Sequence, residues 1–137
     1  RAGLLYLGHR NAVKDDFTPL ENLRASAAIA GEALGEDTAL SALVDIGLGA
    51  RLDVPARNLS QGQRRRVALA RLLCGTRARL WVLDEPFTAL DVRAVAQLAG
   101  AMADHLRGGG AIIYTTHQPV DIDAPRRALL NLDDYAC

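Results

Sequence analysis

RLWVLDEP, at residues 79–86, joins four residues of the buried type to two acids and a proline. An apolar run of this length predicts a central parallel strand that is buried on both faces and ends at Leu83. Proline cannot donate a backbone hydrogen bond, so it opposes continuation of a central strand. Asp84 and Glu85 are therefore expected at the carboxyl end of that strand.

The rest of the chain alternates strand patterns with helix patterns. GLLYLG at 3–8 and AIIYTTH at 111–117 predict two further buried strands, and RALLNL at 127–132 is a candidate for one more. Helices are predicted over about 19–31, 37–46 and 60–73, and from a cap at Thr88 or Asp91 to Gly108. This alternation indicates the α/β class, with a largely parallel sheet and flanking helices. In such folds ligands gather at the carboxyl ends of the strands.

Length and charge exclude several classes of protein. The chain has 137 residues, half of them hydrophobic, which is enough for one domain with its own core. Sixteen Lys and Arg balance sixteen Asp and Glu, so no nucleic-acid partner is expected. The two cysteines and three histidines lack metal-ligand spacing. No apolar run is long enough to cross a membrane and no signal-peptide pattern begins the chain, so a soluble or membrane-peripheral protein is expected.

NLSQGQRRRVALARLL at 58–73 allows two interpretations of its first turn. Ser60 and Gln63 have the spacing of a capping box, in which each side chain bonds the backbone of the other residue. Gly62 is not explained by capping, because glycine costs a helix about 1 kcal/mol relative to alanine. A glycine also leaves the backbone N–H groups of a helix start open to a phosphate. The sequence alone leaves capping and phosphate binding both open.

Asp84, Glu85 and His117 form the second candidate site. Each has a simpler interpretation: acids after a strand are often solvated, and a histidine at a strand end is often structural. Together with a phosphate-binding helix start, they match the needs of nucleotide hydrolysis. Mg²⁺ requires oxygen ligands, the attacking water requires a base, and the γ-phosphate requires donors.

Four motifs in this order resemble the ATP-binding subunits of ABC transporters. LSQGQ is similar to their signature motif, LWVLDE to the Walker B strand, FTALD to the D-loop and TTH to the switch-histidine loop. Within this family, LLYLGH, PLENLR and TTHQ are most similar to the haem exporters of bacterial cytochrome c maturation. The resemblance implies a P-loop NTPase-like fold with a helical signature subdomain. It divides the chain into residues 1–18 with the Q-loop, 19–75 with the signature motif, and 76–137.

The resemblance also implies a role for each candidate residue. Glu85 polarises the attacking water, His117 donates to the γ-phosphate, and Asp84 holds Mg²⁺ through water. His9 stands where most relatives have the Q-loop glutamine.

The remaining roles lie at a dimer interface. Ser60, Gly62 and Gln63 contact the ATP that a second ABC subunit holds, and Asp91 helps to form the interface. The implied cofactors are ATP and Mg²⁺, and the implied partners are that second subunit and an integral membrane permease. The implied location is peripheral, on the cytoplasmic face of the bacterial inner membrane.

No Gly-x4-Gly-Lys-[Ser/Thr] pattern occurs in the sequence. We therefore expect a fragment that lacks the N-terminal part of the domain, with a degenerate subunit as the alternative, and we expect these residues alone not to hydrolyse ATP. The expected function is ATP hydrolysis coupled to export, of haem or in a related step of cytochrome c biogenesis. A non-transport ABC ATPase on ribosomes or DNA, and a non-hydrolysing subunit, remain alternatives.

Overall fold

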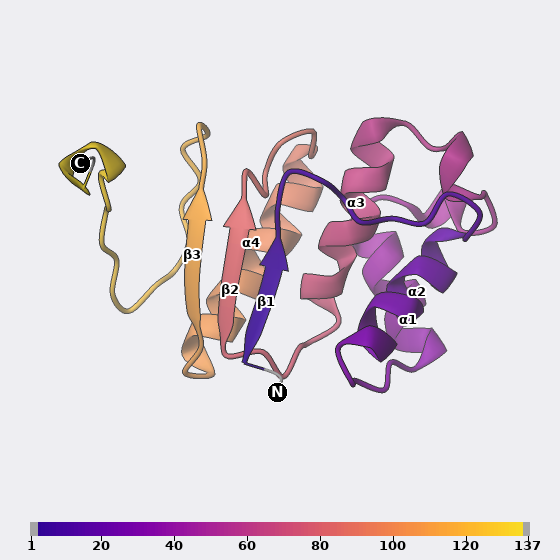
Figure 1. The fold of residues 1–137 in the computed structure, drawn as a ribbon, viewed down its shortest axis with the longest axis horizontal. Coiled ribbons are helices and arrows are strands. Elements are labelled where there is room, and N and C mark those ends of the chain that lie inside the picture. The colour runs from indigo at the N-terminus through magenta and orange to yellow at the C-terminus, as the bar shows by residue number, and fades with distance from the viewer. Residues whose placement is uncertain (1–2, 136–137) are drawn as a thin grey trace.

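Three parallel strands form the sheet in the part of the chain that the structure describes. The structure is a computed structural model that describes residues 3–135. The strands are β1 (Leu4–Leu7), β2 (Leu80–Asp84) and β3 (Ala111–Thr115), in the order β1-β2-β3. Every pair is parallel, as predicted, so all three carboxyl ends lie at the same edge (Figure 1). The central strand ends at Asp84, one residue later than predicted.

Within the described residues, four α-helices accompany the sheet and agree with the predicted segments. Helices α1, α2 and α3 contact one another, and α3 also contacts α4. Figure 1 shows α1 and α2 beside the sheet, α4 behind it, and α3 between the two groups. The helices are α1 (Pro19–Ile29), α2 (Glu36–Asp45), α3 (Gln61–Leu73) and α4 (Val92–Arg107). Short 3-10 turns cover Gly49–Arg51, Ala56–Asn58 and Leu132–Tyr135.

Side-chain caps fix where α1, α3 and α4 begin. Thr18 accepts from the Glu21 N–H, and the Glu21 carboxylate accepts from the Thr18 N–H, which is a complete capping box before α1. Asp91 accepts from the Ala94 N–H at 2.8 Å and caps α4. Of the two caps considered for this helix, the structure uses Asp91. Caps are local in sequence, and this explains why these boundaries were predictable.

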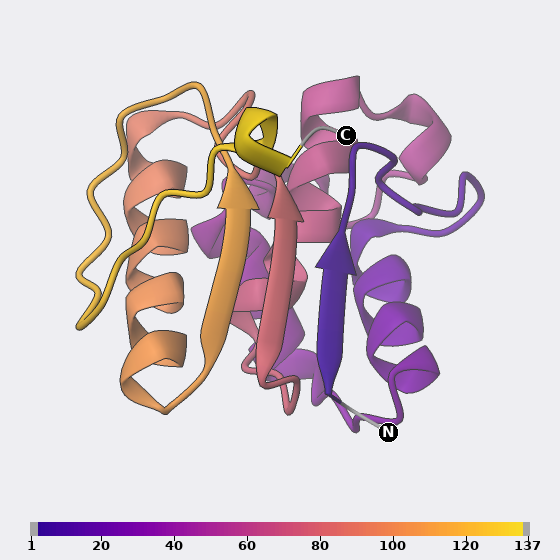
Figure 2. The same cartoon turned by 60° about the vertical axis from the view of Figure 1, so that its left-hand side comes forward.

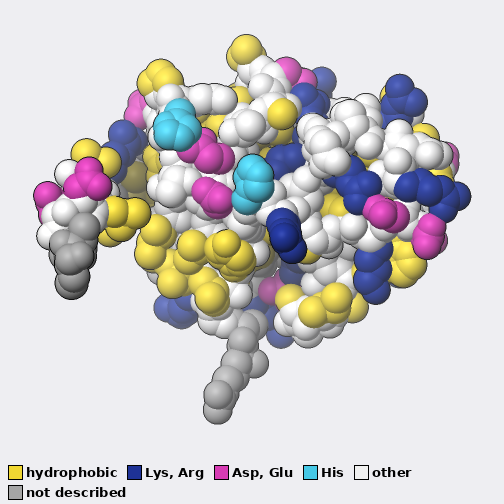
Figure 3. Space-filling model, turned by 45° about the horizontal axis from the view of Figure 1, so that its top comes forward, with side chains coloured by type: hydrophobic (Ala, Val, Ile, Leu, Met, Phe, Trp, Pro, Cys, Tyr) yellow, Lys and Arg dark blue, Asp and Glu magenta, His cyan; other side chains and the backbone are white. Residues whose placement is uncertain are grey.

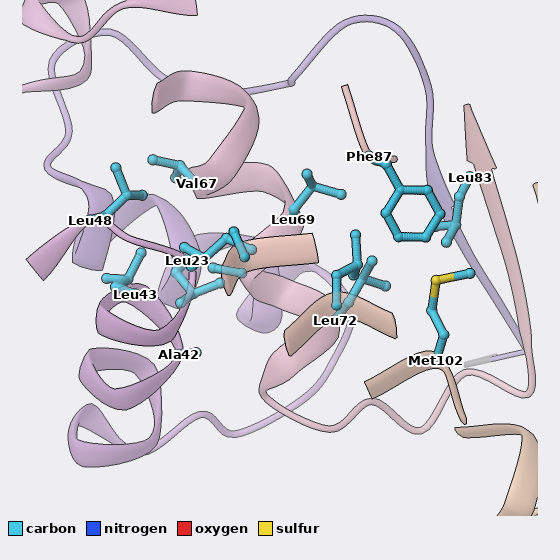
Figure 4. Close-up of a cluster of buried hydrophobic side chains, with 14 of the residues drawn as sticks. Leu23, Ala42, Leu43, Leu48, Val67, Leu69, Leu72, Leu83, Phe87 and Met102 are labelled. Carbon is cyan, nitrogen blue, oxygen red and sulfur yellow. The ribbon is translucent and has the colours of Figure 1, made fainter. Parts of the chain in front are cut away.

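The core continues from the helical group into the sheet through α3. Val67 of α3 lies beside Leu48. Leu72 of α3 lies towards Phe87, which follows β2, and Met102 of α4 (Figure 4). All of these side chains are buried. A single apolar cluster therefore joins the two parts of the molecule.

Among the residues described, one face of the sheet is covered and the other is not, which corrects the prediction of strands buried on both faces. Trp81 and Leu83 of β2 point into the core and are buried. Tyr6, on the other face, is 65% exposed, and Leu4 and Ile113 are exposed as well. Figure 2 shows the helices gathered on one side of the strands. Among residues 3–135 no helix packs against the second face, so the apolar side chains there meet solvent.

Residues 127–132 do not form the additional strand that their composition suggested. They run as irregular chain into the 3-10 turn Leu132–Tyr135. Leu129 is 97% exposed, and Figure 1 shows this segment beyond β3. A strand requires a hydrogen-bonded neighbour, and apolar composition alone does not provide one.

A buried ion pair fastens α3 to the end of α1. Arg71 donates to the Glu32 carboxylate; Arg71 is buried, and the Glu32 side chain is 10% exposed. Glu32 also accepts from the Arg77 N–H at 2.8 Å. Burial raises the pKa of Glu32, but the hydrogen bonds and charges of Arg77 and Arg71 outweigh it, so its pKa lies below the usual value.

We expect Glu32→Gln to lower the free energy of unfolding at pH 7 by about 3 kcal/mol, because the Arg71 charge stays buried without its partner. Glu36→Gln breaks the exposed pair with Arg24 and should cost less than about 1 kcal/mol. Denaturant melts of both variants measure the difference. Because the Glu32 pKa is depressed, the wild-type advantage should fade as the pH falls through that pKa. Equal losses in the two variants would contradict this assignment.

Candidate functional site

The carboxyl ends of β2 and β3 bring the predicted acids and histidine together. Asp84 pairs with Thr115 in the parallel register. Thr115 Oγ1 donates to Asp84 Oδ1 at 2.8 Å and accepts from the Glu85 N–H at 3.0 Å. One hydroxyl thus holds the Asp84 carboxylate and the Glu85 backbone. Thr115 was not identified from the sequence, although its place opposite Asp84 follows once the register is known.

Glu85 and His117 lie in direct contact. His117 Nε2 is 3.2 Å from Glu85 Oε1, and the His117 N–H donates to Glu85 Oε2 at 3.3 Å. Glu85 has a backbone φ of +47°, a left-handed conformation that costs a non-glycine residue about 1–2 kcal/mol. This conformation turns the chain at the strand end. The His117 side chain is 94% exposed, so it can approach a ligand from solvent.

The start of α3 has the capping box that its spacing predicted. The Gln63 N–H donates to Ser60 Oγ at 3.2 Å, and the Ser60 N–H donates to Gln63 Oε1 at 2.9 Å. Gly62 lies in the first turn, where a Cβ would be 3.4 Å from the Cβ of Ala89. The capping interpretation is confirmed. It leaves the phosphate interpretation open, because the first-turn N–H groups of Gln61 and Gly62 have no acceptor within the helix.

Arg66 links the start of α4 to the same end of α3. It donates to Asp91 Oδ2 at 3.2 Å and to the Ala89 carbonyl at 3.2 Å. The Ala94 N–H bond, with the charge and hydrogen bond of Arg66, holds the pKa of Asp91 below its usual value. Gly47 leaves the space for this arginine, since a Cβ there would be 2.6 Å from Arg66 Nη1. The segment from Ala89 to Asp91 is therefore tied to α3 of its own chain.

His9 follows β1, at the same edge of the sheet as Asp84 and Glu85, and its side chain is exposed. Figure 3 shows histidine and acidic side chains next to one another on this face. A buried arginine, Arg65, connects the ends of β1 and β2 by donating to the carbonyls of Gly8 and Asp84. Arg65 was not predicted from the sequence. The available signal was its spacing with Leu69 and Leu72, which puts a charge on the inner face of α3.

The part of the chain that the structure describes has no group of three or more His, Cys, Asp or Glu placed to hold a metal ion. A single carboxylate such as Asp84 is enough for Mg²⁺, because this ion is usually bound by one or two carboxylates and keeps several waters. Between residues 3 and 135, no helix is both long and apolar enough to span a membrane.

Known proteins resemble this chain in sequence and in fold. A family model described as "AAA domain, putative AbiEii toxin, Type IV TA system" matches residues 7–123. The "Cytochrome c biogenesis ATP-binding export protein CcmA" of Aromatoleum aromaticum is 59% identical over 133 residues. The chain belongs to the AAA-domain family that this model describes, and its structural neighbours include ABC ATP-binding proteins. Its match covers 97% of this chain and 62% of that CcmA, so the chain spans about three-fifths of the curated ABC relative.

Solved ABC structures agree in fold. The "Putative ABC transporter (ATP-binding protein)" of Pyrococcus furiosus has a TM-score of 0.71 and 26% identity, and the match covers 90% of this chain and 61% of that one. A dimeric ATP-binding cassette in a post-hydrolysis state, bound to ADP and Pi, has a TM-score of 0.69 and 21% identity. That match covers 85% of this chain and 53% of the other. The P-loop NTPase fold predicted from the motifs is confirmed.

We expect Ser60→Ala to destabilise the protein by about 1 kcal/mol through loss of the α3 cap. Ser41→Ala is the matched control, because Ser41 is exposed within α2 and alanine favours a helix. Denaturant unfolding of both variants makes the comparison. A Ser60→Ala variant as stable as Ser41→Ala would contradict the capping role.

Proposed function

We propose that the full-length protein is the ATP-hydrolysing subunit of an ABC exporter that acts in cytochrome c biogenesis, with haem or a related molecule as cargo. The observation that carries the hydrolytic part is the contact of Glu85 with His117 beside Asp84. The exported cargo is proposed from the names of relatives such as the Aromatoleum aromaticum CcmA. Residues 1–18, 19–75 and 76–137 serve as Q-loop, signature and Walker B regions.

In this proposal Glu85 is the base that orients and polarises the water attacking the γ-phosphate. Its carboxylate stands at a strand end, held in place by the Thr115 hydroxyl bond to the Glu85 N–H. His117 donates to the γ-phosphate from its exposed position. Asp84 would hold Mg²⁺ through water, and the ion would neutralise phosphate charge. Electrostatic stabilisation and positioning are the main sources of catalysis in phosphoryl transfer.

The signature residues act across a dimer in this proposal. Ser60, Gly62 and Gln63 face the γ-phosphate of ATP held by a second subunit, with the N–H groups of the α3 first turn as donors. Asp91 lies at the interface, and His9 senses the ion and the attacking water in place of the usual Q-loop glutamine. A dimer is supported by the fold relative that was solved as a dimer with ADP and Pi.

We also propose an integral membrane permease as the partner, which places the protein peripherally on the cytoplasmic face of the bacterial inner membrane. Balanced charge gives no support to a nucleic-acid partner. Purification of the full-length protein from its native host separates these alternatives. Association with a permease supports the proposal, whereas association with ribosomes or DNA would favour a non-transport ABC ATPase.

In the full-length protein, Glu85→Gln should abolish ATP hydrolysis, preserve ATP binding and favour an ATP-bound dimer. The change is nearly isosteric, so it removes the base without emptying the site. Phosphate release, nucleotide binding and size-exclusion chromatography measure the three effects. Asp84→Asn should instead raise the Mg²⁺ concentration needed for turnover. Hydrolysis by Glu85→Gln near the wild-type rate would remove Glu85 from its proposed role.

Gly62→Asp should stop hydrolysis by placing an anion against the γ-phosphate. Gly62→Ala is the control, since it adds a Cβ without charge and keeps the backbone N–H. Mixed dimers identify which site is lost. In the proposed dimer each ATP site combines Glu85 of one subunit with Gly62 of the other. With Gly62→Asp and Glu85→Gln on different subunits, both changes therefore fall in one such composite site, and the other site stays intact. With both changes on the same subunit, each composite site carries one lesion.

Hydrolysis in the first arrangement and its loss in the second would support action across the interface. The reverse pattern would place Gly62 in the site of its own subunit. Normal activity of the Gly62→Asp homodimer would remove the phosphate role and leave only the capping box.

A further inference from the structure

Arg65 lies in α3 with its guanidinium group inside the protein. The residue is 8% exposed, and its bonds reach the ends of two strands. Nη1 donates to the Gly8 carbonyl at 2.6 Å and to Asn11 Oδ1 at 3.4 Å. Nη2 donates to the Asp84 carbonyl and to the Glu85 carbonyl at 3.5 Å. One side chain thus bonds the backbone before His9 and the backbone on both sides of the Glu85 α-carbon.

We propose that Arg65 is a positioning residue for ATP hydrolysis, which holds the Glu85 backbone in its left-handed turn and fixes it relative to α3 and to the end of β1. This inference rests on the proposed role of Glu85 as the base. Arg65 acts through Glu85 and does not itself touch the reacting atoms.

The backbone of Glu85 explains why such a support is required. A non-glycine residue at φ +47° persists only where its surroundings fix it. The Thr115 hydroxyl holds the Glu85 N–H from the β3 side, and Arg65 holds the adjoining carbonyls from the α3 side. Without Arg65 the peptide after Asp84 loses its bond to the helix, and the carboxylate can move with it.

The chemistry of the arginine fits this task better than simple packing. Burial lowers the pKa of Arg65 and the nearby Asp84 charge raises it, and an arginine remains charged in either case. Burying a charge costs free energy that only hydrogen bonds or a partner charge offset, so packing alone does not favour arginine here. A planar guanidinium has two NH₂ groups that can serve two strands at once, whereas the single ammonium of lysine cannot reproduce that fork.

The neighbouring arginines of α3 have different contacts. Arg64 bonds Asp15 and the Ala56 carbonyl, and Arg71 bonds Glu32. Both lie away from the Glu85 turn in these contacts. Arg71 is also buried, which makes Arg71→Lys a matched control for the loss of a buried guanidinium from the same helix.

The test uses full-length wild type, Arg65→Lys, Arg65→Ala, Arg71→Lys and Glu85→Gln. We expect Arg65→Lys to lower kcat by about 10- to 100-fold, because a shift of about 1 Å in a catalytic group has an effect of this size. The KM for ATP should change by less than about twofold, since Arg65 has no contact with substrate in this proposal. Added guanidinium chloride at non-denaturing concentration should restore part of the activity of Arg65→Ala. The same concentration of NaCl should not restore the activity of Arg65→Ala.

Hydrogen exchange supplies a readout that does not depend on activity. The Glu85 amide should exchange faster in Arg65→Lys than in wild type, and Arg71→Lys should leave it unchanged. A wild type without ATPase activity, or a Glu85→Gln variant with it, would refute the proposed function. The exchange rate of the Glu85 amide would still show whether Arg65 holds the turn. If Glu85→Gln is inactive but Arg65→Lys keeps the wild-type kcat, or if Arg71→Lys loses as much, the positioning role is overturned.

Discussion

The packing of α3 between the sheet and the helical group is the constraint on which this structure depends. The helix must bury apolar side chains towards α1 and α2 and, on another side, towards β2 and α4. Its amino end is thereby fixed near the carboxyl ends of the strands. Because both sides belong to one core, a shift in the position of α3 changes the distance between its first turn, which carries the signature motif, and the carboxyl ends of the strands.

Geometry at the strand ends follows from that packing and from the parallel register. Parallel strands place Asp84 opposite Thr115, and the left-handed turn at Glu85 then directs its carboxylate towards His117. No single element contains this arrangement. It needs two strands for the residues and one helix for the arginine that bonds the turn. The site is a product of tertiary structure, and short motifs mark its members without giving its geometry.

The sequence predicted what local interactions decide. Both capping boxes and the four helices follow from side chains within a few residues of each other, and the α/β class follows from the alternation of patterns. The predictions from sequence were wrong where an element needs a neighbouring strand or helix to be paired or covered. Residues 127–132 are apolar but have no strand beside them, and the second face of the sheet is uncovered among the described residues. The spacing of Arg65 marks it as an inner-face residue of α3, but most of its acceptors are backbone carbonyls, so the sequence does not indicate what it bonds.

The arginine that follows Arg65 gives the fold a mechanical property. Arg66 joins the first turns of α3 to Ala89 and to the cap of α4, so these two segments of one chain form a stiff unit. In the proposed dimer, the signature turn would meet one nucleotide while residues 89–91 face the neighbouring subunit. A displacement of the α3 first turn by the nucleotide would then also move residues 89–91, because Arg66 bonds the two segments together.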